Sequence, residues 1–441
     1  MDPFAVKAIQ LLLSLSLLIV LHELGHFIPA RIFKTRVEKF YLFFDVKFSL
    51  FKKKIGDTVY GIGWLPLGGY VKIAGMIDES MDKEQMAHPP QPWEFRSKPA
   101  WQRLIIMLGG VTVNIIVGFV IYMGILYVYG RNITTVDDLP QGFAVTEQFK
   151  EYGFEDGDQI LKINGEPLDD MMEINRYIFL RDVSNVEVRH ADGTLETVNV
   201  PEDASSKMFE NGLMHAFTPR RLAVIDTVLT DYPAGVVGFK KGDRITSVNG
   251  QSIQYFDEFQ KLTDTVGENS IVVLRDGKEI PFSVTPNEEG LFGLNSFGNE
   301  VLAQLGKTEI EYGLSESIVG GFSYGYYTLR DYVAQFKYVF TKKGATQVGG
   351  FGAIGNLFPP VWDWQSFWAT TALISIILAF MNILPIPALD GGHVMFLLYE
   401  IVSGRKPGDK FMEYAQMVGF FLLIALVLFA NGNDIYRWLF E

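Results

Sequence analysis

The chain has 441 residues, of which 48% are hydrophobic, with a formal net charge of −13 and a mean hydropathy of +0.16. A soluble protein of this length normally has a smaller apolar fraction. The acidic balance disfavours nucleic acid as a partner, and the lack of cysteine excludes disulfides, a thiol catalyst and a cysteine-based zinc site. The apolar residues gather in blocks, which predicts a multi-pass membrane protein.

Four of these blocks are candidates for membrane-spanning helices, because a span needs roughly 20 apolar residues at about 1.5 Å each. We place them at residues 1–33, 103–130, 364–389 and 413–431, the fourth being the shortest. The first block has Lys7 ahead of its apolar stretch, as a secretory signal peptide does. However, HELGHFIPARIFK follows it instead of a small-residue cleavage site, which favours a retained helix.

The first block contains the motif His22-Glu23-Leu24-Gly25-His26. On a helix, residues four apart share a face, so both imidazoles can bind one Zn²⁺. Glu23 then lies beside the metal, where it can deprotonate a bound water and later protonate the leaving amine. Ionisable side chains inside an apolar helix are costly and mark functional sites. The motif predicts a zinc site, with a metal-free polar cluster as the alternative.

Region 34–102 and the link after the third block are rich in basic residues, which places both on the cytoplasmic side by the positive-inside rule. The N-terminus, residues 132–363 and the C-terminus then lie outside. The basic residues are Arg31, Lys34, Arg36, Lys39, Lys47, Lys52, Lys53, Lys54, Lys72, Arg96, Lys98 and Arg103 before the second block, and Arg405, Lys406 and Lys410 after the third.

The outer region contains a repeat: GFEDGDQILKING at 153–165 matches GFKKGDRITSVNG at 238–250 in the same register. Each copy continues into a helical stretch and then into alternating strands around an ADG or RDG turn, which suits a tight hairpin. We therefore expect two small α/β domains, at 140–203 and 220–290. The pattern resembles bacterial PDZ domains, which bind extended chains at a sheet edge. Peptide binding, steric exclusion of bulky proteins and simple space filling all stay open.

Region 310–345 carries apolar residues at alternating three- and four-residue spacing, which predicts an amphipathic helix. Three charged residues disfavour a span, so we expect this helix at the outer membrane interface, with packing against the PDZ-like domains as the alternative. The stripe comprises Phe322, Tyr326, Leu329, Val333, Phe336 and Phe340, and the charged residues are Arg330, Asp331 and Lys337.

A catalytic zinc site needs a third protein ligand besides the two histidines, and Asp390 is the candidate. With one helix between them, the first and third helices run in the same direction. His26 lies only about 8 Å from the cytoplasmic end of the first helix, and Asp390 follows the apolar part of the third. Pro385 and Pro387 break that helix, and the glycines after Asp390 let the backbone turn near the metal. His393 is the rival third ligand.

HELGH in the first helix and NILPIPALDGGH at the end of the third resemble the two hallmark motifs of the site-2 protease family of intramembrane metalloproteases. The resemblance covers nearly the whole chain. It implies four membrane helices in the bacterial inner membrane, one catalytic zinc, ligands His22, His26 and Asp390, and Glu23 as the acid/base. It also implies single-pass membrane protein substrates in the lipid bilayer, such as anti-sigma factors after a first cut by another protease, and remnant signal peptides.

The same resemblance implies substrate-binding residues. Asn382 matches the asparagine that holds the substrate backbone. The segment Gly61–Lys72, with Gly68, Gly69 and Tyr70, is similar to a cytoplasmic-side β-hairpin that dips into the membrane and can hold a substrate extended; an ordinary membrane-surface hairpin is the alternative. In the second helix Val111 replaces the usual proline, so we interpret Gly109, Gly110 and Asn114 as close helix packing. Near Gly349, Phe351 replaces another proline, with no catalytic consequence expected.

Two other functions stay open. A PDZ membrane scaffold without protease activity would have no need of Glu23, because that residue is not required to bind zinc. A metal transporter could use the same ligands, but transporters often contain inverted helix repeats, and none is visible in the sequence. The sequence therefore predicts an intramembrane zinc endopeptidase that uses Glu23 as its proton carrier.

Overall fold

The structure is a computed structural model that describes residues 2–66, 68–76, 88–296 and 307–440. Leu67 and residues 77–87 of the predicted region 34–102 lie outside the described residues. The chain forms two compact units. The first comprises residues 1–130 and 311–441 and contains the long helices, whereas the second comprises residues 131–310.

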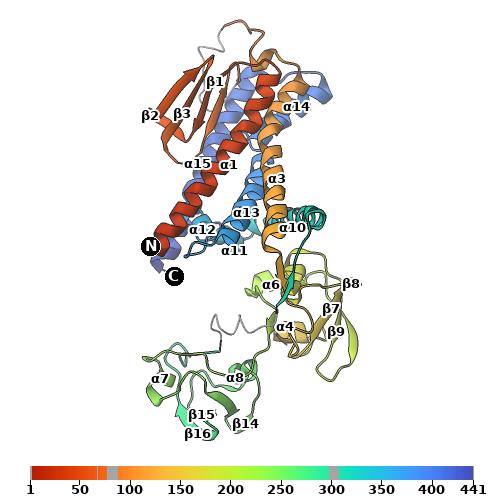
Figure 1. The fold of residues 1–441 in the computed structure, drawn as a ribbon, viewed down its shortest axis with the longest axis vertical. Coiled ribbons are helices and arrows are strands. Elements are labelled where there is room, and N and C mark those ends of the chain that lie inside the picture. The colour runs from red at the N-terminus through yellow and green to blue at the C-terminus, as the bar shows by residue number, and fades with distance from the viewer. Residues whose placement is uncertain (1, 67, 77–87, 297–306, 441) are drawn as a thin grey trace. The chain divides into compact units, whose positions relative to one another are not determined.

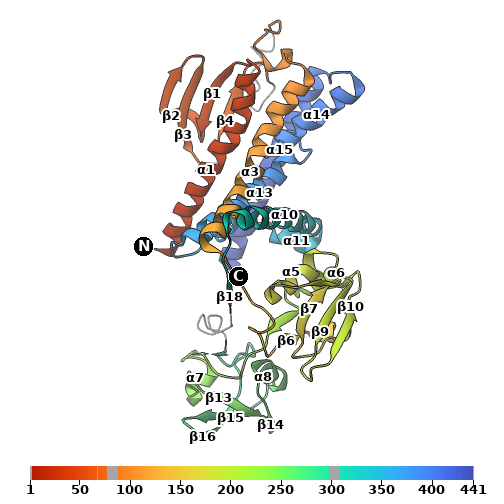
Figure 2. The ribbon, with the colours of Figure 1, turned by 45° about the vertical axis from the view of Figure 1, so that its right-hand side comes forward.

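Among the described residues, four helices are long and apolar enough to cross a membrane, as predicted. Helices α1, α3 and α13 lie side by side in Figures 1 and 2, and α3 packs against both of the others. Their bounds are α1 (Pro3–Ile32), α3 (Ala100–Tyr129), α13 (Trp364–Ile383) and α15 (Asp409–Phe440), so the fourth helix is longer than the predicted 413–431.

Helices α1 and α3 approach each other at a pair of glycines. A Cβ on Gly25 would overlap the backbone of Gly109, and a Cβ on Gly109 would overlap the backbone of Gly25. Only residues without a side chain permit this contact, which confirms the close helix packing expected for Gly109. The contact lies one residue from His26, so it fixes the distance between the HELGH helix and α3.

Region 34–102 forms a four-stranded sheet in the order β2-β3-β1-β4. Strand β1 runs parallel to β3 and antiparallel to β4, so β3 and β4 are not paired with each other. The prediction of a hairpin over Gly61–Lys72 was therefore wrong: the hairpin is β2–β3, and β1 lies between the two strands expected to pair. The bounds are β1 (Val37–Leu42), β2 (Phe44–Ile55), β3 (Thr58–Leu65) and β4 (Tyr70–Ile73), followed by η1 (Phe95–Ser97).

The third spanning helix ends at Ile383, before the two prolines, instead of at 389. Ala388 then takes a left-handed conformation (φ 76°), and a new helix, α14 (Asp390–Ser403), begins at once. A Cβ on Gly391 would overlap the carbonyl groups of Ile383 and Leu384. The proline break and this close turn place Asp390 at the first position of α14.

The amphipathic stripe does form a helix, α10, but it packs on the spanning helices. Phe322 contacts Phe119 of α3 with ring centroids 5.1 Å apart, and Phe336 contacts Phe380 of α13 at 5.3 Å. Both figures show α10 crossing α3. Phe322, Tyr326, Val333 and Phe340 of the stripe are nevertheless exposed, so the expected position of this helix at the outer membrane interface stays a prediction. The bounds here are α10 (Leu314–Val339), α11 (Lys342–Gln347) and α12 (Phe351–Gly355).

The second unit contains both repeat copies, and each is closed by a short strand beyond the predicted boundary. In the first copy β6 pairs with β11, and in the second β12 pairs with β17. The copies therefore extend past 203 to Pro219 and past 290 to Asn295. A further pair, β5 (Arg131–Ile133) with β18 (Thr308–Ile310), joins the two ends of the unit.

The two copies share one plan: a four-stranded sheet with a helix between its second and third strands in sequence. The first copy comprises β6 (Phe143–Val145), α4 (Glu147–Lys150), β7 (Gln159–Ile163), β8 (Glu166–Pro167), η2 (Met171–Glu173), α5 (Ile174–Leu180), β9 (Asn185–Arg189), β10 (Leu195–Asn199), α6 (Ala204–Asn211) and β11 (Phe217–Pro219). The second comprises β12 (Thr227–Val228), α7 (Pro233–Val237), β13 (Arg244–Val248), β14 (Gln251–Ser252), α8 (Phe256–Leu262), β15 (Asn269–Arg275), β16 (Lys278–Val284) and β17 (Leu294–Asn295).

The repeated aspartate has a different partner in each copy. Asp243 accepts two hydrogen bonds from Arg275, both 2.6 Å. The equivalent Asp158 contacts His190 Nδ1 at 2.7 Å, and His190 Nε2 lies 3.1 Å from Glu196. Burial by itself would lower the pKa of His190, but these carboxylates raise it above its usual value. Burial has the opposite effect on a carboxyl group, and it raises the pKa of Asp158 above its usual value. The pair is ionic at pH values between the two pKa values, so its stabilisation is lost when His190 deprotonates.

We expect the first copy to lose stability as pH rises, because a raised histidine pKa stabilises the fold fully below about pH 6.5 and ceases to do so above the folded-state pKa. His190→Arg should flatten this dependence, since arginine stays charged. Hydrogen exchange of β7 and β9 in the full chain, wild type against variant at each pH, measures the difference. Strands β13 and β15 serve as the internal control. Parallel exchange profiles in the two proteins would contradict the expectation.

Candidate metal centre

The three predicted ligands come together although 364 positions separate the last two in the sequence. His22 and His26 lie one turn apart on α1, and Asp390 reaches them from the start of α14. The two Nε2 atoms are 3.2 Å apart, and each lies 3.3 Å from Asp390 Oδ2. In the part of the chain that the structure describes, this is the group of His, Asp and Glu side chains whose spacing suits a metal ion.

This triangle fits tetrahedral zinc. Zinc bonds to nitrogen and oxygen of about 2.0–2.2 Å place neighbouring ligand atoms roughly 3.3–3.5 Å apart. The Oδ2 atom of Asp390 is buried and has no hydrogen bond, which is costly for a carboxylate unless a cation binds it. Three protein ligands leave a fourth position open, as catalytic zinc sites require.

Helix α3 forms a wall of the site. A Cβ on Gly110 would overlap the imidazole of His26 and come within 2.8 Å of His22 Nε2. His26 Nδ1 lies 2.8 Å from the carbonyl oxygen of Ile106, so the ring donates to α3 and turns Nε2 toward Asp390. The sequence indicated close packing for Gly110 but gave no signal for the Ile106 carbonyl, because helix rotation decides which carbonyl faces the ring.

A cavity of 480 Å³ adjoins the three ligands, and Glu23 lines it together with the histidines and Asp390. Five consecutive residues, Gly69–Ile73, also line it. Since neighbouring side chains of a strand point to opposite faces, a cavity that contacts all of them runs along the strand edge. Strand β4 is an outer strand of its sheet. The edge of β4 that faces away from β1 therefore lies beside the metal cluster.

Of the other predicted residues, Gly69 and Tyr70 line the cavity, whereas Gly68 and Asn382 do not. A Cβ on Gly69 would overlap Ile19 of α1, so a glycine is needed where β4 meets the helix. The Tyr70 hydroxyl donates a 2.7 Å hydrogen bond to Asp45. Asn382 is half-buried in the last turn of α13.

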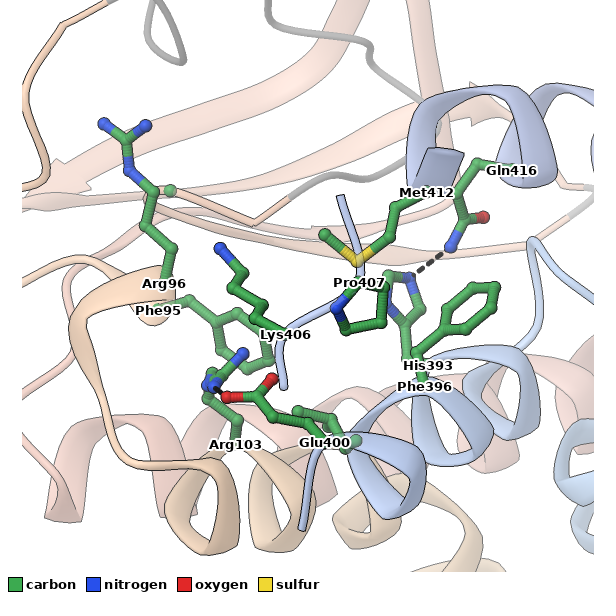
Figure 3. A pocket seen from close by; sticks show the side chains of 12 residues that line it. Phe95, Arg96, Arg103, His393, Phe396, Glu400, Lys406, Pro407, Met412 and Gln416 are labelled. Atoms are coloured by element: carbon green, nitrogen blue, oxygen red, sulfur yellow. Dashed lines mark hydrogen bonds and ion pairs between the residues drawn. The ribbon is translucent and has the colours of Figure 1, made fainter. Parts of the chain in front are cut away.

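The rival ligand His393 lies outside the triangle. Its Nε2 atom is 2.8 Å from Gln416 Nε2, which links α14 to α15. Figure 3 shows the small cavity beside this pair, where Arg103 of α3 also meets Glu400 of α14 at 2.5 Å. These polar contacts hold α14 between α3 and α15, and so support the position of Asp390.

Candidate membrane helices around a histidine–aspartate metal cluster define a class, the membrane-embedded metalloproteases. Comparison with known families agrees: the model of peptidase family M50 matches residues 10–426, and the chain belongs to this family. It is therefore a membrane protein and a zinc metalloprotease, with Zn²⁺ as its cofactor.

Several full-length relatives are similar over almost their whole length. The "Regulator of sigma E protease" of Haemophilus influenzae is 28% identical, with 97% of this chain and 98% of the relative covered. A "Putative zinc metalloprotease" of Thermotoga maritima is 25% identical, with 97% and 99% covered. "Metalloprotease MmpA" of Caulobacter vibrioides is 25% identical, with 99% and 97% covered. The similarity thus includes both structural units.

Gly110→Ala should weaken zinc binding by about tenfold or more, because the added methyl group displaces the imidazoles of both histidines. Gly124→Ala is the matched control: it lies on the same helix, makes the same chemical change and has no atom within 4 Å of the new Cβ. Zinc affinity measured by competition with a chelator compares the two variants. Equal affinity in both would show that Gly110 does not shape the site.

Proposed function

We propose that the protein hydrolyses peptide bonds of membrane-anchored proteins, with zinc held by His22, His26 and Asp390 and with Glu23 as general acid/base. The observation that carries this proposal is the triangle of donor atoms with edges of 3.2–3.3 Å beside a cavity that Glu23 lines. Zinc bound there supplies a Lewis acid that acidifies water and polarises a scissile carbonyl.

Glu23 and Asp390 both line the cavity, but we assign them different roles. Asp390 lies within 3.3 Å of both imidazoles and is committed to the cluster, whereas Glu23 is not part of it. Glu23 is thus free to accept a proton from the attacking water and to deliver it to the leaving amine. The imidazoles and Asp390 hold their positions through contacts with α3 and α14 while that proton moves.

The substrate is proposed to bind as an added strand on β4. A transmembrane helix must be unwound before its amides can be attacked, and backbone pairing with a free strand edge holds a segment extended. Gly68 and Gly69, which directly precede β4, and Tyr70, its first residue, would set the position of the substrate strand. Asn382 would hold the substrate backbone beyond the cavity. The run of cavity-lining residues along β4 supports this arrangement.

The substrates are proposed to be single-pass proteins of the bacterial inner membrane, of the anti-sigma factor kind, together with remnant signal peptides. The name of the Haemophilus influenzae relative supports regulated cleavage of this type. The charge distribution supports a site near the cytoplasmic face, with the second unit on the outside. That unit has the repeat expected of two PDZ-like domains.

The PDZ-like domains are proposed to exclude bulky substrates. In the first copy the side chain of Asn175 on α5 accepts hydrogen bonds from the backbone amides of Ala216 and Phe217 and donates one to the Phe217 carbonyl. These are the backbone groups of β11 and its approach through which an added peptide strand would pair. Because this edge is already occupied, exclusion fits the first copy better than peptide binding.

Glu23→Gln should retain zinc and reduce cleavage by roughly 10²- to 10⁴-fold or more, because it removes the proton carrier but no ligand. Metal analysis and a cleavage assay on a co-expressed membrane substrate test both parts. Asp390→Asn is the contrasting variant and should lose zinc, while His393→Ala should keep it. Full activity of the Glu23 variant would refute the mechanism, and zinc loss only in the His393 variant would refute the ligand set.

Removing residues 131–310 should leave zinc binding intact and allow substrates with large outer domains to be cut. Arg131 and Ile310 lie opposite each other in the β5–β18 pair, so a short glycine linker can join Gly130 to Glu311. Cleavage of one substrate with and without its outer domain measures selectivity. A zinc-loaded deletion protein that cuts neither form would make the second unit part of the catalytic machinery. Unchanged selectivity would mean that another part of the protein excludes bulky substrates, and α10 would be the next element to test.

A further inference from the structure

A buried asparagine from the second spanning helix contacts the first zinc ligand. The side chain of Asn114 has no exposure to solvent, and its Nδ2 atom lies 3.1 Å from Nδ1 of His22. The other amide atom, Oδ1, is also buried and has no hydrogen bond. Asn114 is thus the α3 residue that contacts His22 on the side of the ring away from the metal cluster.

The two ring nitrogens of His22, Nδ1 and Nε2, have different roles. Its Nε2 atom lies in the ligand triangle and must be unprotonated to bind zinc, so Nδ1 must carry the proton of the neutral ring. A protonated Nδ1 needs an acceptor. His26 satisfies the same requirement with the Ile106 carbonyl at 2.8 Å. For His22 the polar atom at hydrogen-bond distance from Nδ1 belongs to Asn114.

The asparagine amide can accept that proton. Its oxygen and nitrogen exchange places by a half-turn about one bond, and which of them faces a histidine nitrogen follows from the ring's tautomer. With Nδ1 protonated, Oδ1 faces the ring and gains the hydrogen bond that it otherwise lacks. With Nδ1 unprotonated, Nδ2 donates to it. One amide therefore holds the ring in both states.

We propose that Asn114 is a positioning residue of the metal centre, which fixes the orientation and tautomer of His22 by accepting a hydrogen bond from Nδ1 when zinc is bound. This inference rests on the proposed zinc site. It replaces our interpretation of Asn114 as a helix-packing residue only, because packing requires volume at this position but no acceptor.

The test separates hydrogen bonding from packing by comparing three variants of the full-length protein in detergent. Asn114→Leu keeps a similar volume and removes the acceptor. Asn114→Asp keeps an acceptor toward Nδ1, as carboxylates do behind many zinc-binding histidines. Ser375→Ala is the control for the helix interface, because the buried Ser375 hydroxyl donates to the backbone carbonyl of Asn114 at 2.7 Å and leaves the Asn114 side chain unchanged.

Zinc affinity, measured by competition with a chelator, should fall about 10- to 100-fold in Asn114→Leu. It should stay close to the wild-type value in Asn114→Asp and Ser375→Ala. The visible absorption of the cobalt-substituted protein should change only in the leucine variant. Equal affinity of the leucine variant and wild type would overturn the proposal. So would a loss of similar size in Ser375→Ala, since packing alone would then explain the effect. A similar loss in Asn114→Asp would also overturn it, since an acceptor at this position would then not be sufficient.

A second measurement does not depend on the folding of any variant. The measurement is ¹⁵N NMR of wild-type protein with ¹⁵N-labelled histidine. After zinc loading, the chemical shifts of His22 should be those of a protonated, hydrogen-bonded Nδ1 and a metal-bound Nε2. A metal-bound Nδ1 would overturn the proposal. Wild-type protein that binds no zinc would instead refute the proposed metal site, so the two failures are distinguishable.

Discussion

The burial of two imidazoles and a carboxylate within one hydrogen-bond length of each other is the constraint on which the helical unit depends. Such groups are expensive in an apolar helix bundle unless they share a cation. Meeting at one point requires α1, α3 and the start of α14 to approach closely. The glycine contact at Gly25 and Gly109 brings the first two together, and Gly110 leaves room for the rings. The break after Ile383 supplies the third partner.

The sequence could predict the candidate ligands because local rules determine them. Helical periodicity alone places His22 and His26 on one face. The parallel course of the first and third helices, with the proline break, predicted that Asp390 lies close to these histidines, as the structure has it. The contacts of the rings with Asn114 and with the Ile106 carbonyl could not be predicted from the sequence, because they depend on the rotation of α3 about its axis. An apolar helix of this kind has no strong periodic pattern that would reveal that rotation.

The second unit and the sheet of region 34–102 show the same difference between local and long-range features. Self-similarity predicted two repeat copies and their hairpins, but β11 and β17 are strands of two or three residues that pair far back along the chain. Nothing local marks such strands. In the sheet of region 34–102, β1 inserts between β3 and β4, so the continuous run from Gly61 to Lys72 misled the hairpin prediction. For α10, the apolar stripe predicted the helix but not its buried face, which consists of Ser317, Gly321, Gly325, Asp331 and Tyr338, whereas Phe322, Tyr326, Val333 and Phe340 of the stripe are exposed.

The two outer strands of the sheet in region 34–102, β2 and β4, differ in length and in their exposed side chains. This difference links the fold to the proposed chemistry. Strand β2, at one edge, is long and exposes Lys47 and Lys52–Lys54, and charged side chains discourage another chain from pairing there. Strand β4, at the other edge, has four residues and borders the cavity that contains Glu23. A strand edge with which another chain can pair is a liability in most proteins. Its place beside the metal cluster suits the proposed binding of substrate to β4, because only a chain that has already lost its helical hydrogen bonds can pair with it. Selection for unwound substrate would then follow from the backbone of β4, and a sequence preference at the cut site would come only from the side chains that line the cavity around it.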